Sequence, residues 1–220
     1  MPAYNERGRI GAVVRGLLSR VDRVIVIDDG SADGTAEEAR AAGADVVAHV
    51  LNRGQGAALK TGTVLATAEG ADIIVHIDAD GQHDPQALPT LLAPIIEGRA
   101  DVVFGSRFMG IESAGMPVSR KLLLAAAREF SSLVLGIPRS VTDPQSGVRA
   151  MTAEAACAVD FRQDRMAHCS EILRLVSRSR LRSVEVPVRV IYTSDTLAKG
   201  QKAADAVKIV WQLLLGAFQR

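Results

Sequence analysis

The sequence lacks the features that mark secreted or nucleic-acid-binding proteins. Its only two cysteines, Cys157 and Cys169, do not have the C-x-x-C spacing of a metal or redox pair. Two free thiols suit a reducing compartment and exclude a disulfide scaffold. The formal net charge is only +1, which gives no overall attraction to nucleic acid. We therefore expect a cytoplasmic protein without a nucleic-acid partner.

Long apolar runs are also missing. A membrane-spanning helix needs about 18 or more apolar residues in a row. Residues 122–137 are interrupted by Arg128 and Glu129, and the apolar stretch 206–218 is too short. The first ten residues contain no apolar signal-peptide core. The two stretches could dock peripherally on the inner face of a membrane, or pack on the core or on a second subunit. Basic residues lie near them: Arg120, Lys121, Lys199, Lys202 and Lys208.

What the sequence does contain is an alternation of short β-branched runs with alanine-rich stretches. This pattern predicts an α/β fold with a mostly parallel sheet flanked by helices. We predict strands at 23–30, 44–51, 72–80, 100–108, 148–151 and 182–192, and helices at 33–43, 54–70, 84–98, 119–135, 169–178 and 203–218. The sequence before residue 23 leaves room for only a truncated first strand. We expect a single domain, 1–220, with halves at 1–108 and 109–220.

Carboxylates gather where two of the predicted strands end. Asp28 and Asp29 follow one apolar run, and Asp78 and Asp80 follow another. Ligands bind beyond the carboxyl ends of the strands in open parallel sheets. The two-residue period places Asp78 and Asp80 on one side of the chain, where they repel each other. A divalent cation such as Mg²⁺ or Mn²⁺ would relieve this repulsion and suits a diphosphate, with Gln82 as a further oxygen ligand.

A phosphate-binding glycine loop is absent. Gly54, Gly56 and Lys60 only weakly resemble an anion site at a helix N-terminus. A nucleotidyltransferase, one alternative function, would normally have a lysine-containing glycine loop near residues 2–9, where the sequence reads PAYNERGR. A metal at the paired aspartates is therefore the better candidate for holding phosphates.

The motifs occur in an order that resembles family 2 glycosyltransferases, in particular the dolichyl-phosphate mannosyltransferase and polyprenyl-phosphate glycosyltransferase branch. The resemblance runs from Pro2 to about Lys202. It is carried by the strings PAYNE, VIDDGSADGT, NRGQGAALKTG, HIDADGQHDP, GSRF, DPQSGVRA and EVPV. It implies a GT-A fold, a GDP- or UDP-sugar donor, a divalent metal at the D-x-D motif and inversion at the anomeric carbon. The implied acceptor is a lipid phosphate or a growing envelope glycan.

The resemblance also implies roles for individual residues. The implied donor-binding residues are Pro2, Tyr4, Glu6, Ile27, Asp29, Asp78 and Ala79. The implied metal ligands are Asp78, Asp80 and Gln82. Arg107 and Ser146 would contact the acceptor, and Asp80, Arg107 and Lys199 would contribute most to catalysis. Arg149 could reach the same phosphate region or form an ion pair within a strand.

The acceptor decides whether a general base is needed. An acceptor phosphate is already ionised and needs none, whereas a hydroxyl acceptor does. The candidate bases would be Asp84, Glu171 and His168. A third interpretation is a nucleotide-sugar-binding module without catalytic activity, and donor hydrolysis with and without metal would separate it from an enzyme.

Overall fold

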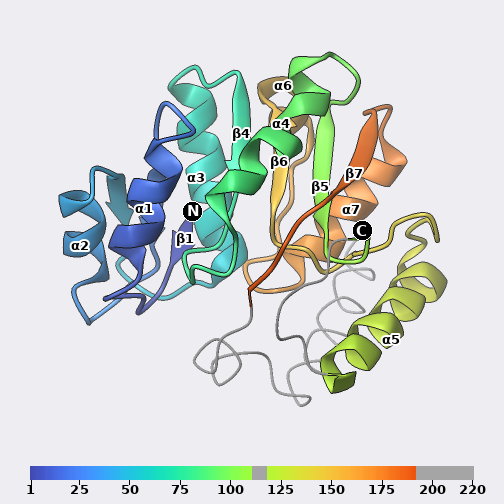
Figure 1. Ribbon diagram of the computed structural model, residues 1–220, viewed down its shortest axis with the longest axis horizontal. Coiled ribbons are helices and arrows are strands. Elements are labelled where there is room, and N and C mark those ends of the chain that lie inside the picture. Colours follow the sequence, from blue (N-terminus) through green and yellow to red (C-terminus); the bar gives the residue numbers. More distant parts are fainter. Residues whose placement is uncertain (111–117, 192–220) are drawn as a thin grey trace.

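The computed structural model describes residues 1–110 and 118–191, and these form two sheets flanked by helices (Figure 1). Sheet A has the strand order β1-β2-β3, with β1 at Pro2–Ala3, β2 at Ile25–Asp28 and β3 at Asp45–Ala48. All of its pairs are parallel. The short first strand expected from the sequence is present as β1.

Sheet B has the order β4-β6-β5-β7. Its strands are β4 at Ile73–His76, β5 at Val102–Ser106, β6 at Arg149–Thr152 and β7 at Ser183–Pro187. β5 and β7 are parallel, but β6 runs antiparallel to both β4 and β5. Because β6 begins beside the points where β4 and β5 end, the turn before β6 is brought to the same edge as the D-x-D motif.

The helices follow the sequence pattern with two additions. The expected helices are α2 at Thr35–Ala41, α3 at Gln55–Ala68, α4 at Leu88–Ile96 preceded by the 3₁₀ turn η1 at Pro85–Ala87, α5 at Val118–Leu135 and α7 at His168–Arg178. The additions are α1 at Ile10–Leu18 and α6 at Ala153–Ala158. α1 buries Ile10, Val14 and Leu17, whose spacing of three and four residues places them on one helical face. The helix expected at 203–218 lies outside the described residues.

The apolar core has two parts. One joins α1 and α4 to both sheets, and the other lies among β4, β6, α3, α6 and α7. Every residue of β5 is buried, from Val102 to Ser106. Gly105 is required there, since a Cβ would lie 2.3 Å from Val148 and 2.7 Å from Val188. This packing fixes the end of β5, and therefore the start of the loop that carries Arg107.

Candidate active site

The D-x-D motif lies in the loop just after β4, which ends at His76 rather than at residue 80. Asp78 Oδ1 accepts a 2.6 Å hydrogen bond from Gln55 Nε2, and its Oδ2 lies 3.7 Å from His83 Nε2. Asp80 Oδ1 accepts from the Gln82 backbone N–H at 2.9 Å. The motif is therefore held by helix α3 on one side and by its own loop on the other.

The two aspartates have opposite pKa shifts. Burial and the Asp78 charge raise the pKa of Asp80. Burial also acts to raise the pKa of Asp78, but its interaction with His83 and the charges of His168 and Arg149 outweigh it and lower that pKa. The ionised form of Asp80 is thus opposed mainly by burial and by its neighbour. This is the situation that a bound cation relieves.

These residues fit a divalent cation that arrives with a diphosphate. Within residues 1–110 and 118–191, no three Asp, Glu, His or Cys side chains form a metal-binding cluster. Magnesium, however, usually takes only one or two carboxylates from the protein and completes its shell with water and substrate phosphates. Asp78 and Asp80 supply such a pair, and Gln82 lies in the same loop.

The turn before β6 packs directly against the D-x-D motif. A Cβ on Gly147 would lie 2.6 Å from Asp78 Oδ2, so only glycine allows this approach. The same turn contains Ser146, which is buried and whose N–H donates to the Asp143 carbonyl at 3.2 Å. The expected donor and acceptor residues are therefore neighbours through Gly147.

Arg107 is held by an aspartate that the sequence analysis did not single out. Its Nε and Nη2 donate to Asp143 Oδ2 and Oδ1 at 2.6 and 2.7 Å. The Arg107 backbone N–H also donates to Asp143 Oδ2 at 3.1 Å. The Arg107 side chain is 10% exposed and that of Asp143 only 1%. This two-pronged contact fixes the guanidinium plane at the end of β5. Lys199 lies outside the described residues.

The expected nucleoside-binding residues surround the start of sheet A. Pro2 pairs with Ile27 across β1 and β2, and both are buried. Tyr4 is 49% exposed, and Glu6 forms a 3.2 Å ion pair with Arg9. Ala79, between Asp78 and Asp80 in the sequence, is buried. Pro2 and Ile27 are thus strand neighbours and Tyr4 and Glu6 follow β1, whereas Ala79 lies in the loop after β4. The Ile27 side chain packs against Gly62 of α3.

The two aspartates after β2 differ in their partners. Asp29 accepts from the backbone N–H groups of Arg53 and Gly54 at 3.0 and 2.7 Å and contacts His49 Nδ1 at 2.8 Å. Asp28 Oδ1 is buried without a hydrogen-bond partner in the described part of the chain. Asp29 therefore organises the loop before α3, whereas Asp28 has the unsatisfied oxygen.

The N-terminus of α3 is in contact with a second segment of the chain. The Ala57 N–H donates to the Asp164 carbonyl at 3.0 Å, and a Cβ on Gly56 would overlap the Gln163 carbonyl oxygen. Lys60 pairs with Asp160. The glycines here allow the second segment to cross the helix end, which gives Gly54 and Gly56 a packing role.

Each candidate general base is engaged elsewhere. Asp84 caps η1 by accepting from the Gln86 N–H at 2.9 Å. Glu171 accepts from the N–H groups of Arg162 and Gln163 at 2.9 and 2.8 Å. His168 is fully buried, with Nδ1 2.8 Å from the Arg165 carbonyl. All three have structural roles in the described chain.

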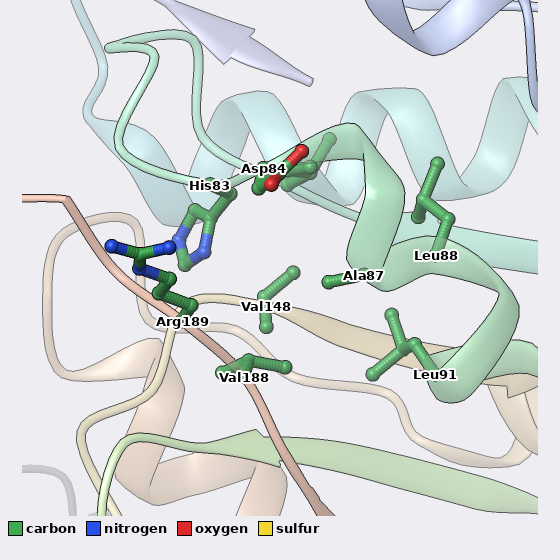
Figure 2. Close-up of a pocket in the computed structure, with 9 residues that line it drawn as sticks. His83, Asp84, Ala87, Leu88, Leu91, Val148, Val188 and Arg189 are labelled. Carbon is green, nitrogen blue, oxygen red and sulfur yellow. The ribbon is translucent and has the colours of Figure 1, made fainter. Parts of the chain in front are cut away.

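A small cavity lies behind the D-x-D loop (Figure 2). His83 and Arg189 stand at one end of the drawn pocket, and Leu88 and Leu91 stand at the other. Its volume is about 10 Å³, which is at most room for one water. It is a packing gap and not a donor site.

Comparison with known proteins identifies the family. Residues 1–140 match the model for glycosyl transferase family 2. An uncharacterised protein of Methanocaldococcus jannaschii is 35% identical over 98% of this chain and 89% of its own length. The UDP-N-acetylglucosamine--dolichyl-phosphate N-acetylglucosaminyltransferase of Methanococcus voltae is 34% identical over 98% of this chain and 93% of its own. The chain belongs to glycosyltransferase family 2, as the motifs indicated.

A solved structure confirms the GT-A fold. Glucosyl-3-phosphoglycerate synthase from Mycobacterium tuberculosis, in complex with Mn²⁺ and UDP-glucose, superposes with a TM-score of 0.74. The alignment covers 98% of this chain and 76% of that one, at 23% identity. The dolichol-phosphate mannosyltransferase of Pyrococcus furiosus is 27% identical over 97% of this chain and 62% of its own length. Membership of glycosyltransferase family 2 therefore favours a glycosyltransferase over the alternative function, a nucleotidyltransferase.

Among residues 1–110 and 118–191, no helix is both long and apolar enough to span a bilayer.

The sequence analysis missed four residues that hold the site together. Gln55 and His83 contact Asp78, Asp143 holds Arg107, and Gly147 makes room for Asp78. All four lie inside the strings that carried the family resemblance. Their position in those strings was the available signal, but it did not indicate which partner each would have.

Proposed function

We propose that this chain catalyses the metal-dependent, inverting transfer of a hexose from a nucleoside-diphosphate sugar to the phosphate of a polyprenyl or dolichyl lipid. The observation that carries the proposal is the contact of Gly147 with Asp78. It sets a pair of aspartates that repel each other beside a turn that carries Ser146 and holds Arg107. A diphosphate with its cation suits the first group, and an acceptor phosphate suits the second.

On the donor side, Asp78 and Asp80 would hold Mg²⁺ or Mn²⁺, with Gln82 as a further ligand. The bound cation would stabilise the negative charge that develops on the departing diphosphate. Gln55 and His83 keep Asp78 oriented. Pro2, Tyr4, Glu6, Ile27, Asp29 and Ala79 are the proposed donor-binding residues. Lys199 would add positive charge at the leaving group.

On the acceptor side, Arg107 and Ser146 would orient a phosphate whose oxygen attacks the anomeric carbon from the face opposite the leaving group. Such an oxygen is already ionised, so no side chain has to remove a proton. The structural engagement of Asp84, Glu171 and His168 supports this acceptor over a glycan hydroxyl. The dolichyl-phosphate and dolichol-phosphate relatives support the same class.

A lipid acceptor would bring the chain to a membrane surface. Phe108 and Met109, next to Arg107, are 41% and 40% exposed, and Leu122 and Leu133 of α5 are 67% and 73% exposed. We propose peripheral contact on the cytoplasmic face, with the lipid phosphate reaching Arg107 from the bilayer.

The proposal is tested by product formation. Purified protein is first screened with UDP- and GDP-sugars plus Mn²⁺ by thermal unfolding, where a donor at a hundred times its Kd should add about 2.7 kcal/mol. The best donor is then incubated with polyprenyl phosphate in detergent. We expect a glycosylated lipid phosphate with inverted anomeric configuration, lost on chelation. Nucleotide release without a lipid product, or a product formed equally well in excess chelator, would contradict the proposal.

A further inference from the structure

The family resemblance implies no functional role for any residue of the EVPV string, residues 185–188. Its glutamate, Glu185, lies in β7 opposite Phe104 of β5 and is partly buried. Its carboxylate accepts hydrogen bonds from a turn 42 or 43 residues earlier in the chain. Glu185 is therefore distant from this turn in the sequence but bonded to it in the fold, which indicates that its carboxylate helps to hold the turn.

Glu185 binds two consecutive peptide N–H groups. Oε2 accepts from the Thr142 N–H at 2.8 Å and from Thr142 Oγ1 at 3.0 Å, and Oε1 accepts from the Asp143 N–H at 3.1 Å. Hydrogen bonds to an ionised carboxylate are shorter and stronger than those between neutral groups. Both oxygens are used, so the Val141–Thr142 and Thr142–Asp143 peptide units are both held in position.

The Thr142–Asp143 peptide in turn determines where the side chains of Thr142 and Asp143 lie. Thr142 Oγ1 lies 2.6 Å from Ser106 Oγ, which accepts from the Phe108 N–H at 3.1 Å. Asp143 holds Arg107 through both the guanidinium and the backbone N–H. A shift of the 142–143 peptide would therefore move the guanidinium of Arg107 and the loop around it.

We propose that Glu185 is a positioning residue of the acceptor half, which acts on Arg107 through the Thr142–Asp143 peptide. In this proposal Glu185 acts without contacting either substrate. Its carboxylate clamps the turn, the turn places Asp143, and Asp143 sets the guanidinium plane of Arg107. The kinetic consequence rests on the proposed function, because it concerns acceptor use; the structural consequence for Arg107 does not.

The Glu185→Gln substitution tests this with almost no change in size. An amide offers one accepting oxygen, and its NH₂ group would face one of the two peptide N–H donors. We expect kcat/KM for the lipid phosphate to fall roughly 10- to 100-fold, since small misplacements of a positioning group have effects of this order. Donor affinity should stay within about twofold.

The matched control is Asp101→Asn. Asp101 joins the same pair of strands at their other end, where it accepts from the Arg182 N–H at 2.7 Å and from Arg182 Nη2 at 2.6 Å. It controls for loosening of the β5–β7 pair without a path to Arg107. We expect it to leave acceptor kcat/KM within about twofold of the unsubstituted protein.

A second readout does not depend on activity. In ¹⁵N-arginine-labelled protein, the Nε–H resonance of Arg107, assigned with Arg107→Lys, should exchange slowly because Asp143 protects it. We expect Glu185→Gln, but not Asp101→Asn, to speed this exchange at least tenfold. If the unsubstituted protein transfers no sugar, the proposed function fails while this readout still decides the role of Glu185.

The inference is overturned if Glu185→Gln leaves the Arg107 resonance and acceptor kinetics like those of Asp101→Asn. It is also overturned if donor affinity falls as much as acceptor use. Should Glu185→Gln fail to fold, Thr142→Val decides instead, because it removes only the hydroxyl contact with Glu185 and Ser106. That variant should show the same selective loss on a smaller scale, and unchanged exchange of the Arg107 Nε–H would refute the role.

Discussion

Two charged pairs lie at the turn that contains Gly147, and they differ in the sign of their charges. Asp78 and Asp80 carry like charges, whereas Asp143 and Arg107 carry opposite charges. In the D-x-D loop, Asp80 lies near the like charge of Asp78, and burial together with that charge raises its pKa. In the acceptor turn, the buried Asp143 is matched by Arg107 through two side-chain contacts. Two like charges in a buried site are balanced only when a cation binds, whereas an ion pair is already balanced in the protein without a ligand. Under the proposed function, the D-x-D loop would therefore need a bound cation to balance its charges, whereas the charges of Asp143 and Arg107 are balanced by the fold.

The largest expected effect comes from removing the repulsion itself. Asp80→Asn takes away one proposed metal ligand and should lower turnover by roughly 100-fold or more, the scale seen when a charge-stabilising group at the reacting centre is lost. A carboxyl whose folded pKa is raised loses stability as pH rises through that pKa, and asparagine has no such loss. At neutral pH in chelator, the inactive variant should therefore be at least as stable as the original.

Turnover with Mn²⁺ and thermal unfolding in chelator measure these two quantities. A variant that keeps full activity, or one that unfolds at a clearly lower temperature without metal, would show that the aspartate pair is not a metal site under repulsion.

The matched pair is tested by Arg107→Lys. Lysine keeps the charge but cannot make the two-pronged contact with Asp143. We expect kcat/KM for the acceptor to fall about 10- to 100-fold with donor affinity little changed. Steady-state kinetics with each substrate varied, together with donor titration, provide the measurement. A large loss of donor binding with normal acceptor kinetics would place Arg107 on the donor side instead.

Sequence reasoning found Asp78, Asp80 and Arg107, but neither Asp143 nor its pairing with Arg107. The D-x-D aspartates, Arg107 and Ser146 follow from motifs that are local in the chain. Asp143 and Glu185 act on partners 36 to 43 residues away, and only the tertiary fold determines such distances. Strand direction is likewise absent from a hydrophobic pattern, so the antiparallel course of β6, which brings the turn to the site, could not be foreseen.

Helix α1 was missed for a local reason. Its sequence, IGAVVRGLL, contains two glycines and two adjacent valines, and both residue types have low helix propensity. Burial of Ile10, Val14 and Leu17 against the core overrides this preference. Asp29 has a structural role that its motif did not indicate, because both of its oxygens accept hydrogen bonds from the loop before α3; its part in donor binding stays a proposal.

A third group of polar side chains, Arg149, His168 and Cys169, is buried near the turn before β6 and gives a pH-dependent prediction. Arg149, expected either to reach phosphate or to form an ion pair, is buried and contacts the Gly147 carbonyl and Cys169 Sγ, both at 3.4 Å. Burial acts to raise the pKa of Cys169, but His168 and Arg149 outweigh it and lower that pKa to about 7. The thiolate form of Cys169 is thus favoured in the folded protein.

Stability should follow this shift. A thiol with a lowered folded pKa contributes stability that is complete above its unfolded value, near 9.0, and is lost as pH falls through about 7. The stability difference between the unsubstituted protein and Cys169→Ser should therefore grow between pH 7 and pH 9, by about 2–3 kcal/mol at most. Urea unfolding at several pH values measures it, with the exposed Cys157→Ser as control. A difference that is constant with pH would exclude the thiolate.

The smallest expected effect concerns membrane binding by the exposed surface, which depends on apolar side chains and not on either charged pair. If the acceptor half receives a lipid phosphate, its exposed apolar side chains should reach the bilayer, and Leu122 and Leu133 of α5 are 67% and 73% exposed. Basic residues near an anionic leaflet add about 1 kcal/mol each at low salt. We expect co-sedimentation with anionic vesicles at low salt, weaker binding at high salt, and weaker binding still for Leu122→Ser combined with Leu133→Ser. Protein that stays in the supernatant with anionic vesicles at low salt would contradict peripheral docking and favour a soluble acceptor, although the contact of Arg107 with Asp143 would be unaffected.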